Sequence, residues 1–168
     1  MFYAINKKSN KKRGYSLIEM LIYISILTTF SVTIIYSIVS FSSSYRNLLA
    51  LRMVDNTAID AMERMTRDIR FASSISISAS TLGANPGVLT LVATVASVST
   101  TTKFYVDSGV LKVDVNGEYL GPLSVANTSI TNLVFTNISG ASSTAVKIDM
   151  AVEATLGTTM KSKIFHST

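Results

Sequence analysis

Hydrophobic and polar positions divide the chain into four zones, of which the first two are sharply defined. Residues 1–14 are polar and cationic, whereas residues 15–45 are apolar and contain no charged side chain from Met20 to Tyr45. About 20 apolar residues suffice to cross a bilayer as a helix, and a single spanning segment must be helical to satisfy its own backbone. The pattern therefore predicts a transmembrane helix over 15–45.

The third zone, residues 46–72, follows without a break, since neither Gly nor Pro occurs between Tyr15 and Ala72. Charged residues pair at helical spacing, which predicts a solvated face. Each such pair stabilises the helix by only a few tenths of a kcal/mol. The pairs are Asp60 with Arg64, Glu63 with Arg67, and Arg64 with Asp68. Apolar residues recur at spacings of three and four, as on one helical face; they are Leu51, Val54, Ala58, Met62, Met65, Ile69 and Ala72. We expect one helix over 15–72 whose outer half is amphipathic.

The fourth zone, residues 73–168, has short alternating runs typical of strands. The predicted strands are Val88–Val98, Thr102–Val106, Val110–Val115, Ile130–Thr136, Ala145–Glu153 and Ser162–His166. Asp107-Ser108-Gly109 and Asn116-Gly117 are hairpin turn signals, and Ala84-Asn85-Pro86-Gly87 marks a loop. Ser/Thr-rich stretches at 73–81, 97–102 and 139–144 are expected to be loops or edges. The fold class is therefore α+β, with the helical stripe packed on a small antiparallel sheet.

The charge distribution bears on the class of partner. The chain has 15 Lys+Arg against 10 Asp+Glu, but Lys7, Lys8, Lys11, Lys12 and Arg13 lie in the first zone. The remaining residues carry ten cations and ten anions, so the basic character belongs to the first zone and gives no support to nucleic-acid binding. A local basic patch at Lys161 and Lys163 stays open. With no cysteine, the chain has neither disulfides nor a Cys-based metal site.

The junction between the first two zones has an unusual order. In a secretory signal peptide the cut follows the apolar core, whereas here the cations run into Gly14 and the apolar core comes afterwards. A cut after Gly14 leaves the apolar helix on the mature protein, and glycine gives a protease close access to the backbone. Glu19 is the sole ionisable acid or base between Tyr15 and Tyr45 when the phenols are set aside. A charge in a membrane helix costs on the order of 3 kcal/mol and usually has a partner.

Residues 12–21, Lys-Arg-Gly-Tyr-Ser-Leu-Ile-Glu-Met-Leu, resemble the cleavage and methylation motif of type IV prepilins and type II secretion pseudopilins. The resemblance implies that a membrane peptidase cuts between Gly14 and Tyr15 and methylates the Tyr15 amine, where the family commonly has Phe. It further implies that Glu19 pairs with the terminal amine of a neighbouring subunit during filament assembly. Residues 62–72 resemble the helix end of J-type minor pseudopilins and related minor pilins. The fold implied is pilin-like.

The resemblance assigns the zones as a leader (1–14), a transmembrane half-helix (15–45), an amphipathic half-helix (46–72) and a β-rich globular domain (73–168). It implies a structural subunit of the cytoplasmic membrane, with its N-terminus inside and its C-terminal domain outside, that enters a pilus or pseudopilus. The implied partners are other pilin or pseudopilin subunits, the prepilin peptidase and the inner-membrane assembly platform. The system served, whether secretion, DNA uptake, adhesion or motility, stays open.

Two other classes of protein are weighed against this interpretation. For an enzyme, His166 is the only histidine and is expected at a strand end on the surface, and the acids of the fourth zone show no metal-ligand spacing; they are Asp107, Asp114, Glu118, Asp149 and Glu153. Neither a phosphate loop nor a hydrolase motif occurs, so the sequence predicts no catalysis and no cofactor and identifies no metal ligand. Whether the loops bind a metal stays open. The alternative is a single-pass anchored β-domain acting as a binding or adhesion module, which leaves the spacing of Gly14 and Glu19 unexplained.

Overall fold

The computed structural model describes residues 14, 16–96, 98–139 and 144–167, which form one long helix, a short 3-10 helix and eight strands. The chain divides into two compact units, residues 1–43 and 44–168. Helix α1 (Leu17–Phe71) belongs to both: its first part lies in the first unit, and its last part packs within the second. The architecture is α+β and pilin-like, as the sequence predicted.

The part of α1 in the first unit presents apolar side chains in every direction. Residues 20–46 are all exposed, and α1 is long and apolar enough to cross a membrane. A helix that is apolar on all sides is stable when lipid or other helices surround it. Together with the length of the segment, this exposure supports a membrane anchor.

The first sheet of the second unit has five antiparallel strands in sequence order. They are β1 (Ser74–Ile75), β2 (Leu89–Val95), β3 (Val98–Asp107), β4 (Val110–Val115) and β5 (Glu118–Pro122), and the 3-10 helix η1 (Ile77–Ala79) lies between β1 and β2. Both predicted hairpin turns are present. Ser108 and Gly109 have φ of 53° and 78°, and Asn116 and Gly117 have φ of 54° and 83°. Two successive positive φ angles match the right-handed twist of the strands on either side.

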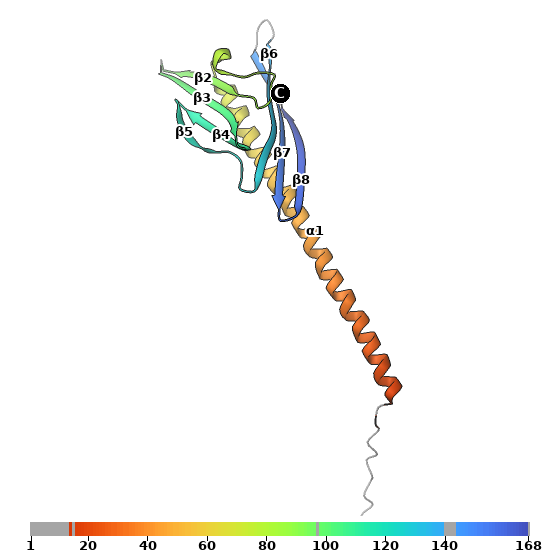
Figure 1. The fold of residues 1–168 in the computed structure, drawn as a ribbon. Helices are drawn as coiled ribbons and strands as arrows, with labels where there is room; N and C mark the ends of the chain where they lie inside the picture. Colours follow the sequence, from red (N-terminus) through yellow and green to blue (C-terminus); the bar gives the residue numbers. More distant parts are fainter. Residues whose placement is uncertain (1–13, 15, 97, 140–143, 168) are drawn as a thin grey trace, which may run out of the picture. The chain divides into compact units, whose positions relative to one another are not determined.

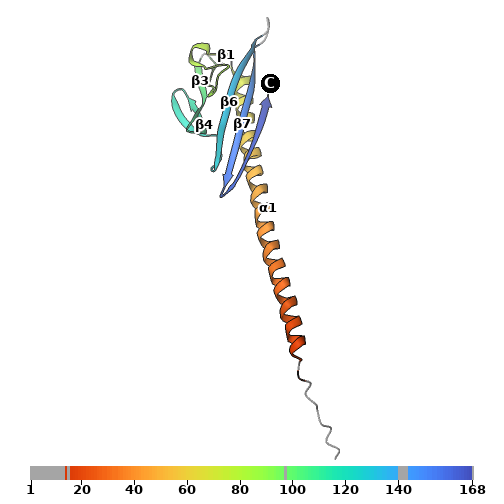
Figure 2. The ribbon, with the colours of Figure 1, turned by 45° about the vertical axis from the view of Figure 1, so that its right-hand side comes forward.

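The second sheet has three antiparallel strands, β6 (Thr128–Ser139), β7 (Thr144–Leu156) and β8 (Thr159–Ser167). The outer edge of β6 is bonded by other parts of the chain: the amides of Gly83 and Gly87 donate to the carbonyls of Phe135 and Leu133 (2.8 and 2.7 Å), and that of Ile130 donates to Gly109 (2.8 Å). These bonds connect the two sheets. In both views the three-stranded sheet lies alongside the C-terminal part of α1 (Figure 1 and Figure 2).

One hydrophobic core joins α1 to both sheets. Helix α1 contributes a buried face of mostly small side chains: Ala50, Val54, Thr57, Ala58, Ala61 and Met65. The sheets contribute larger ones, among them Phe104, Leu111, Phe135, Ile148 and Met150. The small side chains of the helix and the large side chains of the sheets together fill one core.

Polar contacts also tie the helix to the sheets. The Thr57 hydroxyl is fully buried, accepts a hydrogen bond from the Val125 amide (3.4 Å) and lies 3.2 Å from the Thr128 hydroxyl. Lys163, which the sequence left as part of a basic patch, instead forms an ion pair with Asp55 of α1 at 2.8 Å.

Several sequence expectations were wrong in detail. Two sheets are present where one was expected, and β1, β5 and η1 were missed. Residues 99–101, between two predicted strands and expected to be a loop or an edge, lie within β3, because they pair with β2. Leu51 is 38 % exposed, whereas its neighbour Ala50 is buried, so the packed face is rotated from the predicted stripe.

Two of the three predicted ion pairs of the helix are present. Arg64 pairs with Asp68 at 2.9 Å, and Glu63 lies 3.9 Å from Arg67. The third, Asp60 with Arg64, is not found among the ion pairs of the described residues.

Candidate functional site

The candidate site is the start of α1, where the sequence placed Gly14 and Glu19. Gly14 is exposed and non-helical, and a Cβ built on it meets no atom within 4 Å. Its φ also lies outside the range that only glycine adopts easily. The described fold therefore has no steric need for glycine at this position. Tyr15, the predicted methylation site, lies outside the described residues, as does the cationic stretch before Gly14.

The helix begins immediately after this junction. The Ser16 carbonyl accepts hydrogen bonds from the amides of Glu19 (3.0 Å) and Met20 (3.2 Å), which start the helical ladder. Glu19 thus lies in the first turn of α1. A carboxylate in the first turn is stabilised by the unpaired amides and the positive end of the helix dipole. This local effect is one physical reason for an acid at this position.

Glu19 also has a side-chain partner one turn further along. The Tyr23 hydroxyl donates a hydrogen bond to Glu19 Oε1 at 3.2 Å, at the i, i+4 spacing that brings side chains together on a helix. Glu19 is the one residue between Leu17 and Arg46 that is partly buried and not exposed. The carboxylate therefore lies against its own helix, beside a phenol, at the start of an apolar segment.

Four other hydroxyls of this apolar segment are bonded to the backbone of the helix itself. The hydroxyls of Thr28, Thr29, Ser31 and Thr33 donate to backbone carbonyls three or four residues earlier, at 2.9 Å in each case. Such bonds remove the cost of placing a hydroxyl in lipid. Glu19 differs because a carboxylate can accept several hydrogen bonds, and a single phenol satisfies only part of that capacity. It remains able to bind a cation or another donor.

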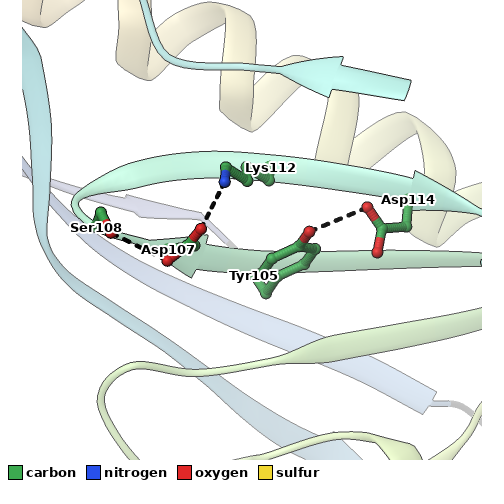
Figure 3. Close-up of polar contacts among 5 residues, drawn as sticks. All are labelled: Tyr105, Asp107, Ser108, Lys112 and Asp114. Carbon is green, nitrogen blue, oxygen red and sulfur yellow. Dashed lines mark hydrogen bonds and ion pairs between the residues drawn. The ribbon is translucent and has the colours of Figure 1, made fainter. Parts of the chain in front are cut away.

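A second polar cluster lies on the five-stranded sheet, around the β3–β4 hairpin (Figure 3). Lys112 donates to Asp107 and holds the pKa of that carboxyl below its usual range, with a further hydrogen bond from Ser108. The same bond raises the pKa of Lys112. Burial, followed by a hydrogen bond to Asp114 at 3.2 Å, raises the pKa of Tyr105. Each charged group drawn there has a partner, as expected of a solvated sheet face.

A third polar group lies on the three-stranded sheet, where the sequence placed its lone histidine. His166 Nδ1 lies 2.5 Å from Asp149, and Lys147 lies 3.0 Å from the other oxygen of that carboxylate. His166 first, then Lys147, holds the pKa of Asp149 below its usual range. Within the described residues no group of His, Asp and Glu is arranged to hold a metal ion. Glu118 lies on β5 and Glu153 on β7.

Sequence reasoning missed the partner of Glu19. The spacing of Glu19 and Tyr23 contains the signal, since residues four apart meet on a helix, but the tyrosine is one aromatic among many apolar neighbours. It also missed Thr57, whose position on the packed face is visible only once the face is known.

Comparison with known proteins bears on the same junction. Residues 9–35 match the prokaryotic N-terminal methylation motif. Neither the curated proteins nor the solved structures gave a match. The motif and the long apolar helix packed on antiparallel sheets support the type IV pilin and pseudopilin family, with prepilin cleavage, N-terminal methylation and membrane anchoring. A motif of this family points to a structural subunit that meets other pilin subunits and the prepilin peptidase.

Proposed function

We propose that the chain is a minor pilin or pseudopilin, a structural subunit without catalytic activity that is assembled through α1 into a type IV pilus or type II secretion pseudopilus. The observation that carries the proposal is the position of Gly14 and Glu19 inside the matched motif, immediately before an exposed apolar helix. A simple anchored domain needs the helix but has no need of either residue.

The first step is removal of the leader, residues 1–14. The prepilin peptidase hydrolyses the bond between Gly14 and Tyr15 and methylates the new amine. The open surroundings of Gly14 support this role, because internal packing gives no reason for glycine while access by a protease does. The apolar segment to residue 45 then remains as the anchor, residues 46–72 carry the packed stripe, and residues 73–168 form the exposed domain.

The second step is pairing of Glu19 with the Tyr15 amine of a neighbouring subunit, or with that subunit's equivalent terminus. A carboxylate in lipid costs about 2.5–3.5 kcal/mol, and an ammonium group is similarly unfavourable. Bringing the two together offsets both costs and fixes the axial stagger of the helices. The partial satisfaction of Glu19 by its own helix supports this role, because capacity for a second partner remains.

The setting follows from the same steps. The chain resides in the cytoplasmic membrane with its leader inside and its globular domain outside, as cations before a membrane segment favour. Its partners are other pilin or pseudopilin subunits, the peptidase and the inner-membrane assembly platform.

Intact-mass and N-terminal analysis of the protein from membranes of its own host, with and without the peptidase, tests the proposal. We expect a chain that begins at Tyr15 with one added methyl group, and a chain that begins at Met1 when the peptidase is absent. A chain that begins at Met1 in the presence of active peptidase would mean an anchored surface domain and would refute the filament function.

A further inference from the structure

The hydrogen bond between Tyr23 and Glu19 suggests more than local stabilisation. The phenol engages Oε1 at 3.2 Å, and no hydrogen bond to Oε2 is found from the residues that the structure describes. A carboxylate has two oxygens and about four acceptor sites. One oxygen is therefore held by the helix while the other stays open to a partner from outside.

We propose that Tyr23 is a positioning residue for Glu19, which orients the carboxylate on the helix surface so that Oε2 meets the incoming amine of another subunit. This inference rests on the proposed assembly role of Glu19. A free glutamate has three rotatable side-chain bonds and can point along the helix, toward the headgroups, or sideways. The phenol limits it to the arrangements that keep Oε1 within reach of residue 23, so less conformational freedom is lost when the pair forms.

The phenol also lowers the free-energy cost of holding the Glu19 carboxylate in the membrane before a partner subunit binds. A hydrogen bond grows stronger where water is scarce. In lipid no water competes for the carboxylate, and the phenol at i+4 is a donor already within reach, at 3.2 Å.

The competing explanation is that Tyr23 is only an aromatic residue suited to the membrane interface, where Tyr and Trp are common. In that case the ring matters and the hydroxyl does not. Tyr36 provides a matched control, because it lies on the same exposed apolar segment and forms no side-chain hydrogen bond among those of the described residues. Replacing either tyrosine with Phe removes one oxygen atom and keeps the ring.

The experiment compares Tyr23→Phe, Tyr36→Phe, Glu19→Gln and the double variant Tyr23→Phe/Glu19→Gln in the full chain, expressed in the host. A membrane-permeant carbodiimide joins a carboxylate directly to an amine that it touches, so a cross-linked peptide containing Glu19 and a subunit N-terminus, identified by mass spectrometry, reports the pair itself. Its yield is normalised to the processed chain in the membrane. Incorporation into filaments, as the ratio of assembled to membrane-pool protein, is the second readout.

We expect Tyr23→Phe to lower the cross-link yield and the incorporation ratio about three- to tenfold, in keeping with the loss of one hydrogen bond of ordinary strength. Tyr36→Phe should stay within about twofold of the wild type, a change small against that loss. In the Glu19→Gln background, Tyr23→Phe should have no further effect on incorporation, because a residue that acts only through the carboxylate has nothing left to orient.

The outcomes separate this inference from the function on which it rests. If Glu19→Gln is incorporated like the wild type, the proposed pairing fails and this inference with it. If Glu19→Gln is defective while Tyr23→Phe cross-links and assembles like Tyr36→Phe, the pairing stands and the positioning role of Tyr23 is refuted. An additive effect of the two substitutions would likewise overturn it.

Discussion

Met65, which is fully buried on the packed face of α1, offers the sharpest test of the helix–sheet core. Met65→Ala removes the side chain beyond Cβ from a site with no access to water, so the loss combines transfer of the removed atoms with the cavity left behind. Substitutions of this kind cost about 2–5 kcal/mol. Because a domain of this size is stable by about 5–15 kcal/mol, the change removes a large share of the total.

Ile59→Ala is the matched control, since Ile59 lies on the same helix but is 58 % exposed. We expect it to change the free energy of unfolding by less than about 1 kcal/mol, partly because Ala favours the helix. Residues 44–168 form a compact unit, so urea unfolding of that fragment, followed by circular dichroism, measures both variants. With a slope near 1.5 kcal/mol/M, a loss of about 3 kcal/mol lowers the midpoint by about 2 M.

The reasoning is refuted if Met65→Ala and Ile59→Ala shift the urea midpoint equally. Equal shifts would mean that the two sides of the helix are buried alike, which contradicts the packed face. A change in the slope of unfolding free energy against urea concentration, without a change in midpoint, would instead report on the denatured state. In that case the comparison is repeated with Val54→Ala, because the Val54 side chain is also fully buried.

Further predictions concern the junction, a buried hydroxyl and acid stability. Gly14→Val should leave the chain folded, because a Cβ there meets no neighbour, yet block cleavage, seen as an uncut mass. Thr57→Val should cost about 1 kcal/mol in urea unfolding, because the Val125 amide loses its acceptor. In the folded protein the pKa values of Asp107 and Asp149 lie below the value of about 4 expected in the unfolded chain. The two ionised carboxylates therefore stabilise the fold fully above about pH 4, and this contribution is lost as pH falls through the folded-state pKa values. The urea midpoint should therefore fall between pH 5 and pH 2, and fall less in the Asp107→Asn/Asp149→Asn variant.

The helix and the hairpins could be predicted because their signals are local. Uninterrupted apolar sequence after residue 15 has few alternatives to a helix, and Asn116-Gly117 fits a turn with two positive φ angles. The division into two sheets could not be predicted, because it depends on which strands share an edge. The amide of Ile130 bonds to Gly109 in place of a strand neighbour, and that choice is made by tertiary packing.

The rotation of the packed face has a similar cause. Spacing alone favoured Leu51 as an inward residue, because leucine is more apolar than its neighbour. The core instead buries Ala50 and Ala61, whose small side chains are combined with large residues of the sheets such as Phe135. Small-to-large complementarity between elements distant in sequence is not visible in the periodicity of either one. The hydrogen bond from Tyr23 to Glu19 could not be predicted for a different reason. In the sequence, Tyr23 is one of many large apolar or aromatic residues in the same segment.

The packed face of α1 is synthesised well before the strands with which it shares a core. Three of the six buried helix residues are alanine, which favours the helix more than any other residue. Val152 of β7, which lies in the same core, is synthesised roughly ten seconds after Met65 at ordinary translation rates of about 5–20 residues per second. During that interval the uncovered face exposes Val54, Met62, Met65 and Ile69 beside its alanines, all of which pack in the finished core. The helix therefore carries an uncovered apolar face until its own strands arrive.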